Sequence, residues 1–232
     1  MRLPVVAISL LLSAHLAHGH PGGLDKQGGH THRATDEYHC HREPCLTLHR
    51  QQQQAEEEAR QQQRAFSGLY ERSDWPHWLD EDGDCQDTRA EILIATSQIP
   101  VTFTREDQCT VASGRWHDPY SGETFTAASE LDIDHLVPLR HAHGHGGEGW
   151  DERHRHQFAN DPANLLPVSA SANRSKGASS PDQWLPENRH YWCQYGQRWQ
   201  AIKLRHQLLI TPPEQAAIDK LLATCQLAET RP

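Results

Sequence analysis

The sequence predicts an α+β fold built around a compact strand–loop–strand–helix unit. The stretch LDIDHLVPL, residues 131–139, alternates apolar and polar residues as a strand does. A second strand is expected after Asn164, and a short helix is expected to hold Asn173 and Lys176. Two further helical segments, 187–209 and 213–226, follow. Two such strands can pair antiparallel while the short helix packs back across them, which is typical of this fold class.

Residues 1–19 are interpreted as a secretory signal peptide. A basic start at Met1-Arg2 precedes an apolar run, and Ala17 and Gly19 provide small residues at the cleavage positions. The mature chain then starts near His20. An uncleaved anchor is the alternative, but the apolar run is shorter than the roughly 20 residues that span a bilayer. We therefore expect a secreted or periplasmic protein with no membrane association after cleavage.

Residues 20–48 form a small module that is rich in Cys and His. It has too few large apolar residues for a core, so a disulfide or a metal has to hold its shape. One alternative is a zinc site, and the other, favoured in an exported protein, is a disulfide-closed loop. The stretch Tyr-His-Cys-His at 38–41 resembles a YHCH module of exported bacterial proteins. The candidate side chains are His30, His32, His39, Cys40, His41 and Cys45.

The six cysteines allow 15 pairings. In an exported protein an even number of cysteines indicates disulfides rather than free thiols. We expect each cysteine to pair with its neighbour in the sequence, which gives Cys40–Cys45, Cys85–Cys109 and Cys193–Cys225.

Residues 49–74 are rich in Gln, Glu and Arg, and they predict a solvated helical spacer. The globular domain is expected over residues 75–232, because tryptophans become frequent only there, and its core motif spans 130–186.

The acidic stretch WLDEDGDC, residues 78–85, allows two interpretations. A calcium loop would need a glycine at its sixth position, but that position holds Cys85 and the glycine is at 83. We favour a turn that caps a helix over 87–97, with Asp87 or Thr88 at its N-terminus. Residues 99–111 are then expected to be extended, and the Gly- and His-rich stretch 141–156 to be a flexible loop.

Within the core motif, one carboxylate, one imidazole and one amide can meet at a single point. Asp134 and Asn173 would supply oxygen ligands, which suit a hard divalent cation such as Mg²⁺. An imidazole has an ordinary pKa of about 6.5, so His135 can accept a proton from water near neutral pH. The combination predicts metal-assisted hydrolysis of a phosphodiester.

Several stretches, taken in order, resemble the HNH endonucleases, the ββα-metal nuclease class, and most closely an exported bacterial branch. Each stretch alone is a weak signal, but the ordered set is specific and covers about residues 75–200. The stretches are W-x-D-x-D-G-D-C-Q-D-T-R at 78–89, G-x-W-x-D-P-Y-x-G at 114–122, D-x-D-H-x-x-P at 132–138, F-A-N-D-P-x-N-L at 158–165, and N-R-S-K-G at 173–177, followed by W-L-P.

The resemblance implies a role for each residue that matches the family pattern. His135 would be the general base and Asn164 the catalytic-site residue that positions it, while Asp134 and Asn173 would bind the metal. The implied cofactor is one divalent ion, Mg²⁺ first, with Mn²⁺ or another divalent ion as alternatives. The implied substrate is DNA, or RNA, cleaved by a monomer. Asp132 and Lys176 would play supporting roles, with Lys176 as a cation that faces the phosphate, and Arg153, Arg155 and Arg174 are candidate substrate contacts.

Other interpretations remain beside this one. The net charge of −9 excludes a generally basic, DNA-coating protein, although residues 140–206 carry more Lys and Arg than Asp and Glu. No helix-turn-helix or zinc-finger pattern is present, so strict sequence recognition is not expected. Taken singly, His135 could be a core histidine and the two asparagines turn residues. The alternative functions are an exported His-rich metal-binding protein and an inactive nuclease-like module that binds DNA.

Overall fold

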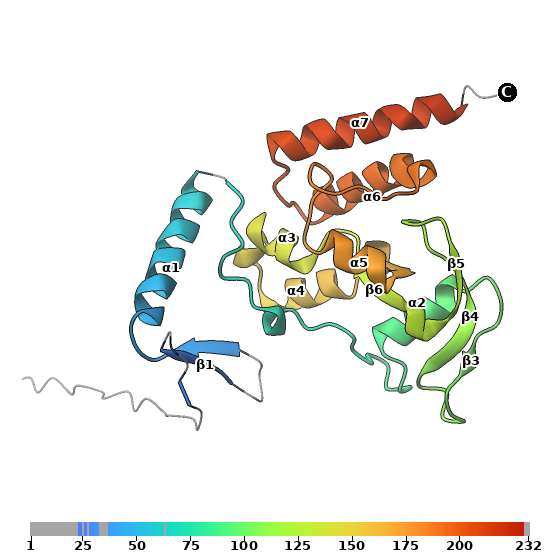
Figure 1. Ribbon diagram of the computed structural model, residues 1–232, viewed down its shortest axis with the longest axis horizontal. Helices are drawn as coiled ribbons and strands as arrows, with labels where there is room; N and C mark the ends of the chain where they lie inside the picture. Colours follow the sequence, from blue (N-terminus) through green and yellow to red (C-terminus); the bar gives the residue numbers. More distant parts are fainter. Residues whose placement is uncertain (1–22, 25, 27, 33–36, 63, 230–232) are drawn as a thin grey trace, which may run out of the picture. The chain divides into compact units, whose positions relative to one another are not determined.

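The computed structural model describes the chain except for residues 1–22, 25, 27, 33–36, 63 and 230–232 (Figure 1). The expected signal peptide lies outside the described residues. The chain divides into two compact units, Met1–Leu46 and Thr47–Pro232, and each is described by itself. Among the described residues, no helix has both the length and the apolar character that crossing a membrane requires.

The first unit contains a small hairpin. Strand β1 (Gly29–His32) pairs antiparallel with β2 (Glu37–Cys40), and Gly29 lies opposite Cys40. A disulfide joins Cys40 to Cys45. Of the two alternatives for this module, the disulfide-closed loop is therefore the one found, and these two thiols cannot bind zinc.

The second unit combines helices with two small antiparallel sheets, as the α+β prediction required. Strands β3 (Thr102–Phe103), β4 (Val111–His117) and β5 (Thr124–Ala127) form one sheet, and β6 (Leu131–His135) and β7 (Leu165–Ser169) form the other. The α-helices are α1 (Cys45–Gln61, which starts in the first unit), α2 (Thr88–Thr96), α3 (Leu139–Gly144), α4 (Glu152–Ala159), α5 (Ala170–Lys176), α6 (Trp192–Arg205) and α7 (Pro212–Glu229).

The pair β6–β7 lies between two hydrophobic clusters. Leu131 and Ile133 pack into the cluster that includes Leu93 of α2 and Trp116 of β4. Val168 belongs to the larger cluster, which includes residues of α4, α6 and α7. Because apolar side chains are buried on both sides, the register of β6 is fixed: a slip of one residue would exchange Leu131 and Ile133 for aspartates.

The predicted strand–loop–strand–helix unit is present. Leu131 lies opposite Ser169 and His135 opposite Leu165, so the two strands are antiparallel. The Ser169 side chain then accepts a hydrogen bond from the Ala172 amide, which caps α5, and α5 packs on both strands. Strand β6 ends at His135, and Pro138 precedes α3, so the strand terminates close to the proline as its missing N–H suggests.

The expected disulfides and the expected helix cap are confirmed. Cys85 pairs with Cys109 and Cys193 with Cys225, in addition to the bond in the first unit. Asp87 caps α2 by accepting a hydrogen bond from the Ala90 amide. In the acidic stretch before it, the Asp80 carboxylate accepts the amides of Gly83 and Cys85, which is a turn geometry.

The prediction of an extended segment over residues 99–111 was wrong. Only Thr102–Phe103 is a strand before residue 111, and the longer strand, Val111–His117, begins at the last residue of the expected range. Trp116 explains the difference: it is fully buried, and its indole N–H donates to the Leu93 carbonyl of α2 at 2.8 Å. Tertiary packing against α2 therefore decides where the strand forms.

The prediction of a flexible loop over residues 141–156 was also wrong. Helices α3 and α4 occupy most of this stretch, and Ala142 and Phe158 are fully buried. The glycines allow close backbone contact: a Cβ on Gly144 would lie 2.8 Å from the Phe66 backbone, and one on Gly147 would lie 2.7 Å from the Ala142 carbonyl oxygen. Their role is dense packing rather than mobility.

His143 on α3 is one consequence of this packing. The residue is 4% exposed, and neither ring nitrogen has a hydrogen-bond partner among the described residues, although Nε2 lies 3.7 Å from the Glu56 carboxylate. Its pKa falls from 6.5 to about 4, mainly through burial and also through the nearby cations of Arg155 and Arg140.

We predict that His143 makes the protein less stable in acid. As pH falls below 6.5 the unfolded chain gains a proton at this residue, but the folded chain does not until about pH 4, so stability is lost across that window. Urea unfolding from pH 7 to pH 4 should show a smaller loss in His143→Asn than in the wild type. Equal losses in the two proteins would contradict the assignment.

A second prediction concerns Gly196, where α6 meets α7. A Cβ on Gly196 would lie 2.7 Å from the Leu221 Cβ. We expect Gly196→Ala to destabilise the protein by about 1–3 kcal/mol, although alanine favours a helix by about 1 kcal/mol. The exposed neighbour Gln197 is the control, because Gln197→Ala should change the free energy of unfolding by less than about 0.5 kcal/mol. A stabilised Gly196→Ala protein would show that the two helices can separate freely.

Candidate active site

The predicted site residues gather where β6 ends and α5 packs across it. Asp134, His135 and Asn173 all line one cavity of about 300 Å³. Asp134 and His135 are neighbours in sequence and would point to opposite faces of a regular strand. The end of β6 at His135 allows both to reach this cavity.

Asp134 is buried and is held by two donors. The Tyr120 hydroxyl donates to its Oδ2 at 2.6 Å, and the Lys176 ammonium lies 2.8 Å from Oδ2 and 3.0 Å from Oδ1. Burial raises the pKa of Asp134, and the Lys176 charge opposes that shift. Burial likewise lowers the pKa of Lys176, and the Asp134 charge opposes that shift. Each ion therefore offsets part of the free-energy cost of burying the other.

Lys176 does not occupy the position expected of a phosphate-facing cation. It is 1% exposed, and its ammonium donates both to Asp134 and to the His135 carbonyl oxygen, at 2.9 Å. The reason is that Asp134 is too deeply buried to be left without a counter-charge. Lys176 therefore orders the end of β6 rather than facing the cavity.

The protonation of His135 is set by a backbone carbonyl. Its Nε2 lies 2.8 Å from the Ala159 carbonyl oxygen, which can only accept, so Nε2 carries the hydrogen. In the neutral ring Nδ1 is then the acceptor. The pKa of His135 falls from 6.5 to about 3, mainly because the ring is buried; the charges of Arg72, His77 and Lys176 contribute to the fall, and the bond to Ala159 opposes it. The ring is thus neutral at any physiological pH.

Asn164 holds the chain that follows His135. Its amide oxygen accepts from the Val137 N–H at 2.8 Å, and its amide nitrogen donates to the Val137 carbonyl at 3.1 Å. The Asn164 carbonyl also accepts the Leu136 N–H. Asn164 is fully buried and makes no contact with the cavity, so it is a positioning residue.

Asp132 and Asn173 lie together on the cavity side of β6 and α5. The Asn173 amide nitrogen donates to Asp132 Oδ2 at 3.0 Å. This bond uses only the amide nitrogen, so the amide oxygen of Asn173, the expected ligand atom, is not part of it. The supporting role expected for Asp132 is therefore the orientation of Asn173.

The three arginines expected to contact substrate do not line the cavity. Arg155 is largely occupied: it donates to the Glu148 carbonyl, pairs with Asp74 at 3.5 Å and lies over the Trp75 ring. Arg153 and Arg174 are exposed. The direction of these side chains depends on tertiary partners that the sequence pattern does not identify.

Two other arginines and a tyrosine line the cavity instead: Arg72, Arg140 and Tyr70. The Arg72 guanidinium lies 3.1 Å from His77 Nε2, while His77 Nδ1 lies 2.6 Å from the Trp75 carbonyl oxygen. Since that carbonyl only accepts, His77 Nε2 accepts from Arg72 and steadies it. Arg140 follows LDIDHLVPL directly, which was a signal available in the sequence; Arg72 lies in the stretch interpreted as a spacer.

The G-x-W-x-D-P-Y-x-G stretch contributes two buried side chains that hydrogen-bond to the elements of the site. Besides Tyr120, it contributes Asp118, whose Oδ2 accepts the Ser169 amide at 3.0 Å and the Ser121 hydroxyl at 2.8 Å. The turn between β4 and β5 is thereby tied to the junction of β7 and α5. Neither residue was among the predicted site residues.

Comparison with known proteins adds two matches. Residues 87–212 match the family described as the C-terminal domain of GmrSD restriction endonucleases. A protein of Arthroderma benhamiae named as an uncharacterized secreted protein is 36% identical over 158 residues, which is 67% of this chain and 76% of that relative. No solved structure matches.

These matches bear on export and on family. The secreted relative and the three disulfides confirm the predicted export. The HNH type, the bacterial branch and the YHCH module stay predictions. The matched region includes every residue of the cavity except Tyr70 and Arg72. The chain belongs to the family of the C-terminal domain of GmrSD restriction endonucleases.

Proposed function

We propose that the protein is an exported, metal-dependent endonuclease of the HNH type that hydrolyses phosphodiester bonds of DNA, or of RNA. Family membership supports nuclease activity. The observation that carries the mechanism is the fixed tautomer of His135 in a cavity shared with Asp134, Asn173 and two arginines.

His135 is the proposed general base. Its Nδ1 accepts a proton from the attacking water, while the Ala159 carbonyl holds the ring by Nε2. The low pKa keeps the ring neutral and able to accept. A phosphodiester bound between Arg72 and Arg140 would bring a negative charge that offsets these cations, so it would stabilise the imidazolium formed in the step.

The donor set fits a hard divalent cation. Asp134 and Asn173 would hold it through one carboxylate and one amide oxygen, and Mg²⁺ commonly keeps several waters beside so few protein ligands. A carboxylate has about four lone-pair sites, so the bonds from Tyr120 and Lys176 leave Asp134 capacity for a metal. When bound, the ion would stabilise charge on the phosphate and the leaving oxygen. Mg²⁺ is the first candidate, and Mn²⁺ or another divalent ion is the alternative.

The cations proposed to bind the phosphate are Arg72 and Arg140, because they line the cavity. Lys176 acts inside the protein by balancing Asp134. Asn164 keeps the segment after His135 in place through both atoms of its amide. The sequence contains no helix-turn-helix or zinc-finger pattern that would read bases, so strict sequence specificity is not expected.

We predict that His135→Ala lowers the rate of plasmid cleavage at least about 100-fold, the low end for loss of a general base. The assay uses purified protein, supercoiled plasmid and Mg²⁺, and circular dichroism checks the fold. His190→Ala, at an exposed histidine outside the cavity, is the control and should cleave like the wild type. EDTA should stop cleavage, and added Mg²⁺ should restore it.

Each result separates the candidate functions. Full activity of His135→Ala would rule out this mechanism, and activity that persists in EDTA would rule out the metal. A wild-type protein that binds plasmid but never cleaves it would favour the inactive DNA-binding module. A protein that does neither but binds Zn²⁺ tightly would favour the metal-binding alternative.

We also predict that Arg140→Ala lowers kcat/KM for plasmid by about tenfold to 100-fold, since a charge-assisted hydrogen bond contributes about 1.5–3 kcal/mol. The slope of log affinity against log salt should fall by about one. Arg174→Ala, at another exposed arginine that does not line the cavity, should change kcat/KM by less than about twofold. A larger effect at Arg174 than at Arg140 would indicate that the substrate binds along α5 rather than at the cavity edge that Arg140 lines.

A further inference from the structure

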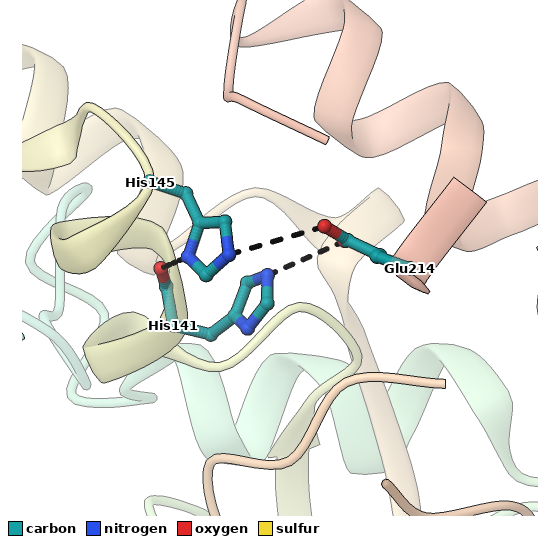
Figure 2. Close-up of side chains that lie close together, drawn as sticks. All are labelled: His141, His145 and Glu214. Carbon is teal, nitrogen blue, oxygen red and sulfur yellow. Dashed lines mark hydrogen bonds and ion pairs between the residues drawn. The ribbon is translucent and has the colours of Figure 1, made fainter. Parts of the chain in front are cut away.

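A second group of metal-ligating side chains lies outside the candidate active site. His141 and His145, at and just after the C-terminal part of α3, converge on Glu214 in the first turn of α7 (Figure 2). The His141 Nε2 lies 3.4 Å from Glu214 Oε1, and the His145 Nε2 lies 3.9 Å from Glu214 Oε2. All three side chains are nearly or fully buried, with Glu214 at 0% exposure.

Both imidazoles present lone pairs to this carboxylate. The His145 Nδ1 lies 2.6 Å from the His141 carbonyl oxygen and must donate to it, so the Nε2 of the neutral ring is an acceptor. The Lys203 ammonium lies 2.8 Å from His141 Nε2, and an ammonium can only donate, so this nitrogen is an acceptor too. Two nitrogens and a carboxylate, all acceptors, therefore face one another around a single cation.

That cation is Lys203, which is fully buried. Its ammonium lies 2.9 Å from Glu214 Oε1 and 3.1 Å from Oε2, in addition to its contact with His141. One ammonium thus faces two carboxylate oxygens and an imidazole nitrogen, all of which can accept a hydrogen bond or bind a cation.

The ligand atoms lie close to the spacing of a four-coordinate zinc site, within 4.8 Å of one another. Bonds of about 2.0–2.2 Å in a tetrahedron place neighbouring ligand atoms about 3.3–3.6 Å apart. The 3.4 Å pair meets this range. The 3.9 Å pair involves the other oxygen of Glu214, and the two imidazole rings are stacked with their centroids 3.7 Å apart, so binding would require one ring to turn until both Nε2 atoms face the same ion. Two imidazole nitrogens and one carboxylate oxygen are a donor set that zinc favours and magnesium does not.

The surrounding groups already orient the ligands. The Trp199 indole donates to Glu214 Oε1 at 2.7 Å, and the Thr211 amide donates to Oε2 at 3.2 Å. The bond from His145 Nδ1 to a carbonyl is the contact that typically fixes a zinc-binding histidine. A cavity of about 410 Å³, lined by both histidines and by Arg140, offers a route of entry.

We propose that His141, His145 and Glu214 form a second metal site that takes Zn²⁺, and that Zn²⁺ and the Lys203 ammonium compete for one position. Binding would move the Lys203 ammonium out of this position. Because α3 begins four residues after His135, the metal would join the segment that follows the proposed base to the C-terminal helices α6 and α7.

The test compares metal binding by the full chain and two matched variants. His145→Asn keeps a donor near the Nδ1 position and removes Nε2, and His143→Asn changes a histidine of similar burial on the same helix. After treatment with a chelator, calorimetry should show that the wild type and His143→Asn bind one more equivalent of Zn²⁺ than His145→Asn. Co²⁺, used as a spectroscopic probe, should give the visible absorption of a four-coordinate ion only in the first two proteins.

Lys203→Met tests the competition. The Lys203 ammonium lies 2.8 Å from His141 Nε2 and 2.9 Å from Glu214 Oε1, so methionine at this position removes the competing cation and should tighten Zn²⁺ binding by about tenfold or more. The Zn²⁺-dependent rise in Tm should be larger in this variant than in the wild type. This readout does not depend on nuclease activity.

The proposal is overturned if His145→Asn binds as many equivalents of Zn²⁺ as the wild type. A four-coordinate Co²⁺ spectrum in His145→Asn would overturn it as well. If Lys203→Met folds and binds Zn²⁺ no tighter than the wild type, the competition is wrong. If Lys203→Met does not fold, the His145→Asn comparison decides the site alone.

Discussion

The buried pair of Asp134 and Lys176 is the constraint on which the site depends. Two opposite charges, both nearly inaccessible, lie 2.8 Å apart and tie α5 to β6. Removing one partner of such a pair leaves an uncompensated charge and costs about 3–5 kcal/mol. The Tyr120 hydroxyl extends the contact to the turn after β4. Through this one carboxylate, three elements that are distant in sequence meet where the proposed base emerges.

A similar arrangement recurs beyond α3. Lys203 and Glu214 are also fully buried and paired, and they join α6 to α7. Residues 135–145 therefore run between two buried lysine–carboxylate pairs, each of which contacts a histidine or its backbone. Charges this deep persist only where hydrogen bonds satisfy them, which explains why the histidines, hydroxyl and indole around them are so closely arranged.

The electrostatics of the cavity are local rather than global. The chain carries a net charge of −9, yet Arg72 and Arg140 line the cavity. Lys176 balances the charge of Asp134, the buried carboxylate in the cavity lining. Burial is the main cause of the low pKa of His135, and the charges of Arg72 and Lys176 act in the same direction. Arg72 and Arg140 at the cavity edge favour an anion. Arg72 therefore contributes both to the attraction of a phosphodiester and to the neutrality of the proposed base.

The sequence by itself determined the features that short-range chemistry encodes. These are the strand LDIDH and its partner after Asn164, the helix of Asn173 and Lys176, the Asp87 cap and the pairing of neighbouring cysteines. Only the tertiary structure decided that residues 139–159 are largely helical, that Lys176 turns inward, and that Arg72 and Arg140 line the cavity. The reason is that periodicity and caps act within a few residues, whereas the direction of a charged side chain depends on partners such as Asp134, 42 positions from Lys176.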